Sequence, residues 1–129
     1  MTNTITIMPE TNATTLFVHL HDTISVDDYI QFFDTPVRAI QQKNGWYNLL
    51  VYYDRDFKGW SEQAAALSFK CITDIGSTAR RLAYVSPPDQ RILLMKMMRP
   101  IIKAETRYFN LEDLDDAIAW MQAYRPETR

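Results

Sequence analysis

The sequence predicts an α/β fold, built as a mixed or largely parallel β-sheet with crossover helices. Two strand patterns come first, and amphipathic helical patterns then alternate with single strands up to a final helix. The chain of 129 residues is 47% hydrophobic and 23% charged, which suits one globular domain over residues 1–129. This composition argues against disorder, a fibrous repeat and a disulfide scaffold.

The chain is expected to begin with a β-hairpin. Residues 4–8 alternate threonine with apolar side chains up to Pro9, and residues 14–21 read TTLFVHLH. In a strand, successive side chains point to opposite faces. One face of the second strand therefore carries Leu16, Val18 and Leu20, and the other carries Phe17, His19 and His21.

A helix is expected to follow Ser25, whose hydroxyl can accept a backbone N–H of the first turn. Its apolar residues fall on one helical stripe. They are Val26, Tyr29, Ile30, Phe33, Val37 and Ile40. Because Pro36 lacks a backbone N–H, we expect a bend near residues 34–35. Gly45 is expected to end the helix.

The segment WYNLLVYYD at residues 46–54 predicts a central strand, because consecutive apolar residues are typical of a strand covered on both faces. A polar and aromatic loop is expected over residues 55–60. Ser61 can then cap a helix over residues 62–74 that ends at Gly76. The inward side chains of this helix are expected to be Ala64, Leu67, Ser68, Cys71, Ile72 and Ile75.

The last third of the chain is expected to form a strand, a helix, a strand and a helix. The two strands cover residues 81–86 and 105–109, and a helix over residues 88–98 lies between them. The apolar residues of that helix surround its axis, which predicts burial on more than one side. Asn110 is expected to cap the final helix. The buried stripe of this final helix is expected to be Leu111, Leu114, Ala117, Ile118 and Met121.

Four segments share a pattern with a known family. They are ISVDDY at residues 24–29, DFKGWS at 56–61, RLAYVSPPDQ at 81–90 and FNLEDLDDAIAWM at 109–121. In this order and spacing the chain resembles the SpoIIAA-like proteins, which are related to the STAS domain of anti-sigma-factor antagonists and sulphate transporters. The resemblance implies a SpoIIAA/STAS-like mixed sheet of four to five strands with about four helices packed against it. Most such proteins have no assigned activity.

Ser61 is a candidate regulatory residue because of this resemblance. In anti-sigma-factor antagonists a serine at the start of the helix after the third strand is phosphorylated, and Ser61 looks equivalent in position. The surrounding GWSEQ lacks the Asp-Ser-x-Gly-like motif of those proteins. We therefore expect Ser61 to act first as a helix cap, with phosphorylation or a ligand contact at the helix N-terminus as alternatives.

The sequence contains no constellation typical of catalysis or of a cofactor. His19 and His21 share a strand face, and Asp54 and Asp56 follow a strand, so each pair is a candidate for metal binding. The chain has only two histidines, and we expect a polar strand face and a solvated turn rather than a metal site. Cys71 is expected to pack in the core. We therefore expect no enzymatic activity, no metal and no cofactor.

The combination of methionine and aromatic residues is the strongest indication of binding. The candidate binding residues are Phe57, Trp60, Ser61, Met95, Met97 and Met98, and Trp120 and Met121 belong to the same set of side chains. Flexible thioethers beside aromatics fill irregular cores and also form adaptable surfaces. Core packing, a self-association surface and a pocket for a lipid-like ligand therefore remain open. Lys96, Arg99 and Lys103 could border such a surface or bind an anionic headgroup.

The overall charge and the cysteine content limit the classes of partner. With 14 basic and 16 acidic side chains the formal charge is −2, so we expect no nucleic-acid binding. We also expect no membrane span, because no apolar run reaches the roughly 20 residues that a bilayer requires. A single cysteine suits a reducing compartment, which predicts a cytoplasmic protein.

Together these features predict a non-enzymatic regulatory or binding module that acts through protein–protein contacts. We expect it to form a homodimer through the helix over residues 88–98, with a further protein partner as an option. The alternative function is that of a carrier or sensor of a small apolar, lipid-like ligand lodged between the sheet and this helix.

Overall fold

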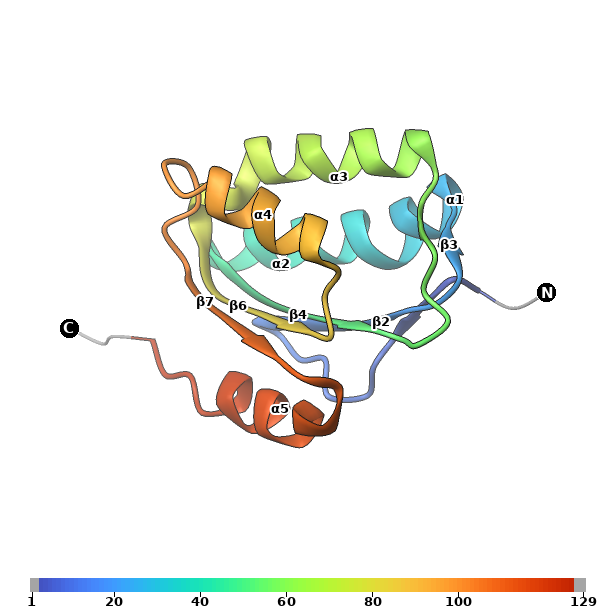
Figure 1. The fold of residues 1–129 in the computed structure, drawn as a ribbon. Helices are drawn as coiled ribbons and strands as arrows, with labels where there is room; N and C mark the ends of the chain where they lie inside the picture. Colours follow the sequence, from blue (N-terminus) through green and yellow to red (C-terminus); the bar gives the residue numbers. More distant parts are fainter. Residues whose placement is uncertain (1–2, 127–129) are drawn as a thin grey trace.

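A computed structural model describes residues 3–126 and arranges them around a five-stranded sheet (Figure 1). The strands, in the order in which they lie side by side, are β1 (Ile5–Ile7), β2 (Thr15–Leu20), β4 (Tyr47–Tyr53), β6 (Ala79–Val85) and β7 (Glu105–Phe109). The β1 strand pairs with β2 in antiparallel fashion, and all other neighbours are parallel. The predicted hairpin, the central strand and the mixed α/β class are confirmed.

The helices cover both faces of this sheet. They are α1 (Val26–Tyr29), α2 (Thr35–Asn44), α3 (Glu62–Ile75), α4 (Asp89–Met97) and α5 (Leu114–Gln122). Figure 1 shows α1 to α4 on one face and α5 alone on the other. None of the helices in residues 3–126 has the length and hydrophobicity needed to cross a bilayer.

Two hydrophobic cores result from this arrangement. The larger core lies under α1 to α4 and includes Leu16, Val18 and Leu20 of β2. The smaller core lies under α5 and is formed by Phe17, Leu50, Ala83, Val85, Ala117 and Met121. The alternation predicted for β2 is therefore confirmed, because Leu16, Val18 and Leu20 enter the larger core and Phe17 enters the smaller one.

The expected bend near Pro36 takes the form of a π-helical segment, η1 (Ile30–Asp34), between α1 and α2. The Thr35 N–H donates to the Ile30 carbonyl five residues back, and Pro36 lies in the first turn of α2, where its missing N–H is tolerated. The buried positions Tyr29, Phe33 and Val37 recur every four residues across this wide turn. The predicted stripe is wrong at Ile30, which is 43% exposed.

Most predicted helix ends are confirmed, and two differ. The Ser25 and Ser61 hydroxyls accept the N–H groups of Asp28 (3.2 Å) and Ala64 (3.1 Å). Gly45 ends α2 in the left-handed region at φ +79°. The other predicted glycine stop, Gly76, has an ordinary φ of −58° and continues into the 3₁₀ turn η2 (Gly76–Thr78). Asn110 precedes a second 3₁₀ turn, η3 (Leu111–Asp113), and its side chain forms no capping hydrogen bond.

The segment expected to be a loop over residues 55–60 contains a short strand. The strands β3 (Thr23–Ile24) and β5 (Gly59–Trp60) pair in parallel beside the main sheet. This pairing fixes Trp60 next to the start of α3, where the sequence indicated only a flexible connection.

Candidate functional site

An open groove lies between the N-terminal ends of α3 and α4. Its volume is about 540 Å³, and its lining is formed by Phe57, Lys58, Gly59, Trp60, Ala65, Pro88, Gln90, Arg91 and Leu94. These residues follow the carboxyl ends of the parallel strands β4 and β6, where α/β proteins commonly bind ligands. The rings of Phe57 and Trp60, two predicted binding residues, lie with their centroids 6.4 Å apart.

Arg91 of α4 supplies the positive charge of this groove, and sequence reasoning missed it. The guanidinium carbon lies 5.3 Å from the centroid of the Trp60 ring, a cation–π distance. It also lies close to the hydroxyls of Tyr53 and Tyr84. Within residues 3–126 Arg91 forms no salt bridge with an acidic side chain. A partly buried arginine with only neutral neighbours is suited to an anionic group of a partner or ligand.

Ser61 lies beside this groove, but its hydroxyl is already used. The Oγ atom accepts the Ala64 N–H at 3.1 Å and so caps α3. Capping, the first of the three roles considered for Ser61, is confirmed. Phosphorylation of Ser61 stays a prediction.

The predicted methionines point in different directions. Met95 is 4% exposed and accepts a hydrogen bond from the Tyr84 hydroxyl at its sulfur (3.4 Å). Met97 is 68% exposed, whereas Met98 packs partly against the larger core. Trp120 and Met121 lie in the smaller core, on the other side of the sheet. The methionine and aromatic set therefore does not form one surface.

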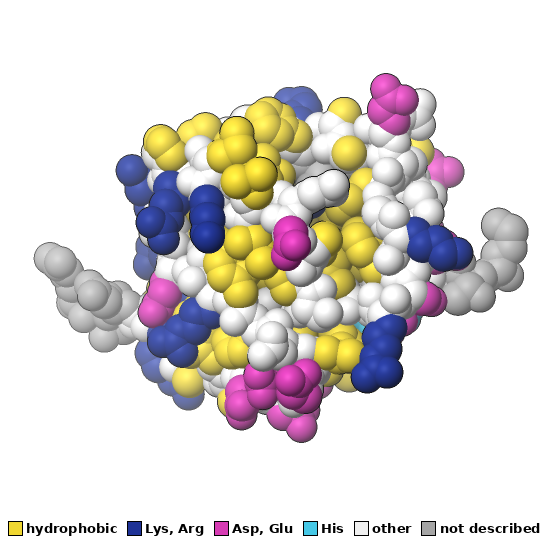
Figure 2. Space-filling view, viewed as in Figure 1, with side chains coloured by type: hydrophobic (Ala, Val, Ile, Leu, Met, Phe, Trp, Pro, Cys, Tyr) yellow, Lys and Arg dark blue, Asp and Glu magenta, His cyan; other side chains and the backbone are white. Residues whose placement is uncertain are grey.

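The prediction that α4 is buried on more than one side is wrong for the single chain. Only Met95 of this helix is buried, and Leu93 and Met97 are 60% and 68% exposed. These two side chains, one helical turn apart, form an outward apolar face that Ile101 extends. Figure 2 shows hydrophobic side chains gathered in the upper part of the view, over the helical layer that contains α4, with basic side chains at the left, whereas the acidic cluster at the bottom lies over α5.

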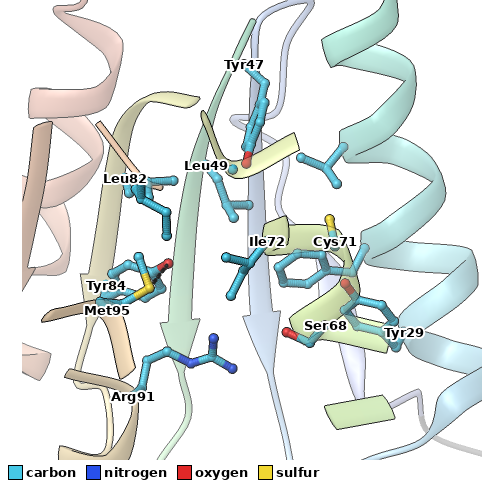
Figure 3. Close-up of a pocket in the computed structure, with 14 residues that line it drawn as sticks. Tyr29, Tyr47, Leu49, Ser68, Cys71, Ile72, Leu82, Tyr84, Arg91 and Met95 are labelled. Atoms are coloured by element: carbon cyan, nitrogen blue, oxygen red, sulfur yellow. Dashed lines mark hydrogen bonds between the residues drawn. The ribbon is translucent and has the colours of Figure 1, made fainter. Parts of the chain in front are cut away.

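The space beneath α4 is small. A cavity of about 40 Å³ lies between the sheet, α3 and α4, and Figure 3 shows Cys71, Ile72, Leu82, Arg91 and Met95 around it. Pockets for small molecules usually measure about 300–1,000 Å³, so this cavity is of a size for water rather than an acyl chain. The buried Tyr29 hydroxyl lines it without a hydrogen-bond partner in residues 3–126, and burial raises the pKa of this tyrosine.

Cys71 lines the same cavity as a buried thiol. Burial raises its pKa to about 11, with Asp34 acting in the same direction. At neutral pH the thiol is therefore protonated and a poor nucleophile. The predicted role of Cys71 as a core residue is confirmed.

The two histidines and two aspartates that the sequence presented as separate pairs meet at one end of the sheet. The His19 Nε2 lies 2.9 Å from Asp54 Oδ1, and His21 Nδ1 lies 4.0 Å from Asp54 Oδ2 and 3.8 Å from Asp56 Oδ1. The parallel pairing of β2 with β4 brings them together, since His19 is opposite Tyr52 in the register. The Asp22 carboxylate points away from this group, 3.4 Å from Lys58 Nζ, although the Asp22 backbone N–H donates to Asp56 Oδ1 at 3.2 Å.

The environment of this cluster favours a neutral imidazole beside a carboxylate. Burial lowers the pKa of His19, and nearby His21 acts in the same direction, while the hydrogen bond to Asp54 opposes both. The Asp56 backbone N–H donates to Asp54 Oδ2 at 3.1 Å and is the largest of the effects that lower the pKa of Asp54.

Comparison with known proteins gives a family and a fold. The model of the SpoIIAA-like family matches residues 15–122. A crystal structure of an uncharacterized protein of the DUF3478 family from Shewanella loihica PV-4, described as having a SpoIIAA-like fold, is similar with a TM-score of 0.62. The two sequences are 21% identical, and the match covers 93% of this chain and 95% of that chain, so the likeness concerns the fold. The comparison with curated proteins found no match.

Proposed function

This chain belongs to the SpoIIAA-like family, and from that premise we propose that it is a non-enzymatic binding module that pairs with a second copy of itself through α4. The observation that carries this proposal is the exposure of Leu93 and Met97, the two most exposed large hydrophobic side chains in residues 3–126. An apolar face of this kind on a small domain usually marks a contact surface.

The charges around this face favour a second copy as the occupant. Asp89 begins α4 and shares a groove with Glu112, so this end of the face is acidic. Lys96, Arg99 and Lys103 surround a second groove at the other end of the helix, which is basic. An antiparallel pairing of two copies of α4 places each basic end opposite an acidic end.

The spacing of side chains along α4 fits the same arrangement. Asp89, Leu93 and Met97 follow one another at intervals of four residues and therefore lie on one side of the helix. A two-fold axis near Leu93 brings the two Leu93 side chains together and each Asp89 close to the basic end of the partner copy. The antiparallel helix dipoles add a favourable term.

Replacing both outward apolar residues by glutamate tests this proposal. We expect wild-type protein to show the mass of a dimer in size-exclusion chromatography with light scattering, and Leu93→Glu/Met97→Glu to show that of a monomer with an unchanged circular dichroism spectrum. Ile30→Glu on η1 is the matched control, because Ile30 is also exposed (43%) but lies away from α4. Met98 is not replaced because it packs against the core. A monomeric wild type, or a double variant that keeps the dimer mass, would contradict the proposal.

The groove with Arg91 favours a second candidate function, the binding of a small apolar ligand that carries an anionic group. The groove volume of about 540 Å³ is in the range of small-molecule sites, unlike the cavity beneath α4. Phe57, Trp60 and Leu94 would contact the apolar part, and the Arg91 guanidinium would pair with a carboxylate or phosphate. A carrier role placed here needs no movement of α4.

Decanoate is a suitable probe for this second candidate. We expect saturable binding in isothermal titration calorimetry, about tenfold or more weaker in Arg91→Gln, since a charge-assisted hydrogen bond contributes about 1.5–3 kcal/mol. Arg80→Gln is the matched control, because Arg80 also lies over a tryptophan, 5.2 Å from the Trp46 ring centroid, but outside the groove. No binding of decanoate to the wild type, or equal losses in both variants, would remove this candidate.

The proposed location follows the chemistry of the single thiol. A buried, protonated Cys71 with no disulfide partner in the chain suits a reducing compartment, and we propose the cytoplasm.

A further inference from the structure

We propose that His19, His21 and Asp54 form a binding site for a divalent transition-metal ion, with Asp56 as the nearest additional carboxylate. The site lies at the end of β2 and β4, and it is independent of the groove and of the outward face of α4. Both histidines of the chain belong to it.

The distances between the donor atoms suit a small ion. One ligand atom from each of His19, His21 and Asp54 lies within 4.8 Å of the others. Zinc binds nitrogen and oxygen at about 2.0–2.2 Å, which places the ligands of a tetrahedral site about 3.3 Å apart. His19 Nε2 lies 2.9 Å from Asp54 Oδ1 and His21 Nδ1 lies 4.0 Å from the second oxygen, Asp54 Oδ2, so these two distances are shorter and longer than this value. Small side-chain rotations therefore bring the three donors to a common centre.

The contacts within the cluster leave His21 Nδ1 available to an ion. The His19 Nε2 has a hydrogen bond with Asp54, but the distances from His21 Nδ1 to both carboxylates, 3.8 and 4.0 Å, exceed hydrogen-bond length. An ion between the three side chains would give His21 Nδ1 a partner and would replace the single His19–Asp54 hydrogen bond with three coordinate bonds.

Stacking supports one of the donors, and the site is open to solvent. His19 stacks on Tyr52 with 4.0 Å between ring centroids and 7° between planes. The side chains of His19, His21 and Asp54 are 21%, 27% and 29% exposed, so an ion can enter. His19 lies in β2, and His21 and Asp54 directly follow the last residues of β2 and β4, so the two paired strands position all three donors.

The donor set selects the class of metal. Two imidazoles and a carboxylate suit Zn²⁺, Ni²⁺, Co²⁺ or Cu²⁺, whereas Ca²⁺ and Mg²⁺ prefer shells made of oxygen. Three protein ligands also leave a coordination position for water or for a group of a partner.

Titration of the metal-free protein with ZnCl₂ tests the site. We expect one ion bound per chain in isothermal titration calorimetry, with affinity reduced about tenfold or more in His21→Gln and in Asp54→Asn. Asp22→Asn is the matched control, because this neighbouring acid is paired with Lys58 and lies outside the cluster, and we expect it to keep the wild-type affinity.

Nuclear magnetic resonance of the histidine rings supplies a second measurement that does not depend on heat. We expect Zn²⁺ to shift the ring nitrogens of both His19 and His21 in the folded wild type, and Mg²⁺ to leave them unchanged. Absence of saturable Zn²⁺ binding to the wild type, or unchanged affinity in both His21→Gln and Asp54→Asn, would overturn the proposal.

Discussion

At the scale of single residues, Ser61 has a structural role, although its position resembles that of a serine that is phosphorylated in related proteins. Its hydroxyl caps α3, and the Ser25 hydroxyl caps α1 in the same way, at 3.1 Å and 3.2 Å. The two serines therefore have the same local geometry, and capping alone does not distinguish Ser61 as a site of modification.

Loss of this cap is expected to destabilise the protein measurably. Ser61→Ala removes the acceptor for the Ala64 N–H, which should lower the free energy of unfolding by about 1 kcal/mol, and Ser61→Asn should retain most of it. Urea denaturation followed by circular dichroism measures both variants. Equal stability of Ser61→Ala and wild type would mean that water replaces the hydroxyl without loss.

Contacts between residues that are far apart in the sequence could not be predicted, whereas local contacts could. The two caps could be predicted because a serine before an amphipathic pattern is a local signal. The contact between His19 and Asp54 joins residues 35 positions apart and depends on how β2 and β4 pair, which no local pattern specifies. Arg91 was missed for a similar reason, since its partners come from three other elements.

At the scale of elements, the predicted strands and helices agree with the structure where the element is long enough to show a periodic pattern of apolar side chains. The strand over residues 105–109 and the start of α3 after Ser61 coincide with their predictions. The strands β3 and β5 contain two residues each, which is too short for a period to be recognised. The π segment also lacks a local signature, although Pro36 indicated an irregularity close to it.

The end of α2 gives a prediction for an element boundary. Gly45 has a φ of +79°, and its N–H donates to the Gln41 carbonyl at 2.7 Å. No atom lies within 4 Å of an added Cβ, so Gly45→Ala changes only the conformational energy of the backbone. We expect a loss of about 1 kcal/mol in the free energy of unfolding, and a smaller loss for Gly45→Asn, because asparagine tolerates the left-handed region better. A chemical denaturation series checks this, and a fully stable alanine variant would contradict it.

At the scale of the whole molecule, the sheet separates residues that look like one group in the sequence. Met121 and Trp120 of α5 pack in the smaller core, and Met95 of α4 packs in the larger core. The methionine and aromatic set is therefore divided between two cores. Periodicity gives the faces of each element but not the side of the sheet on which a helix lies. What remains outside both cores is the outward face of α4 with Leu93 and Met97.

This face is the centre of the proposed function. It combines the exposed apolar residues of the helix with an acidic end and a basic end. In an antiparallel pair of two copies the apolar residues would be buried and each acidic end would face a basic end. The histidine cluster lies at the end of β2 and β4, away from α4, whereas the groove with Arg91 is partly lined by α4 itself through Gln90, Arg91 and Leu94.

Cysteine cross-linking at Leu93 measures the proposed contact most directly. In the two-fold arrangement the Leu93 side chains of two copies meet, while the native thiol of Cys71 is buried and does not compete. We expect Leu93→Cys to form a disulfide-linked dimer readily under mild oxidation, and Ile30→Cys, which is exposed on η1 rather than on α4, to remain largely monomeric. If Leu93→Cys forms no more cross-linked dimer than Ile30→Cys, the two copies do not meet through α4 and the account of this protein as a self-pairing module is wrong.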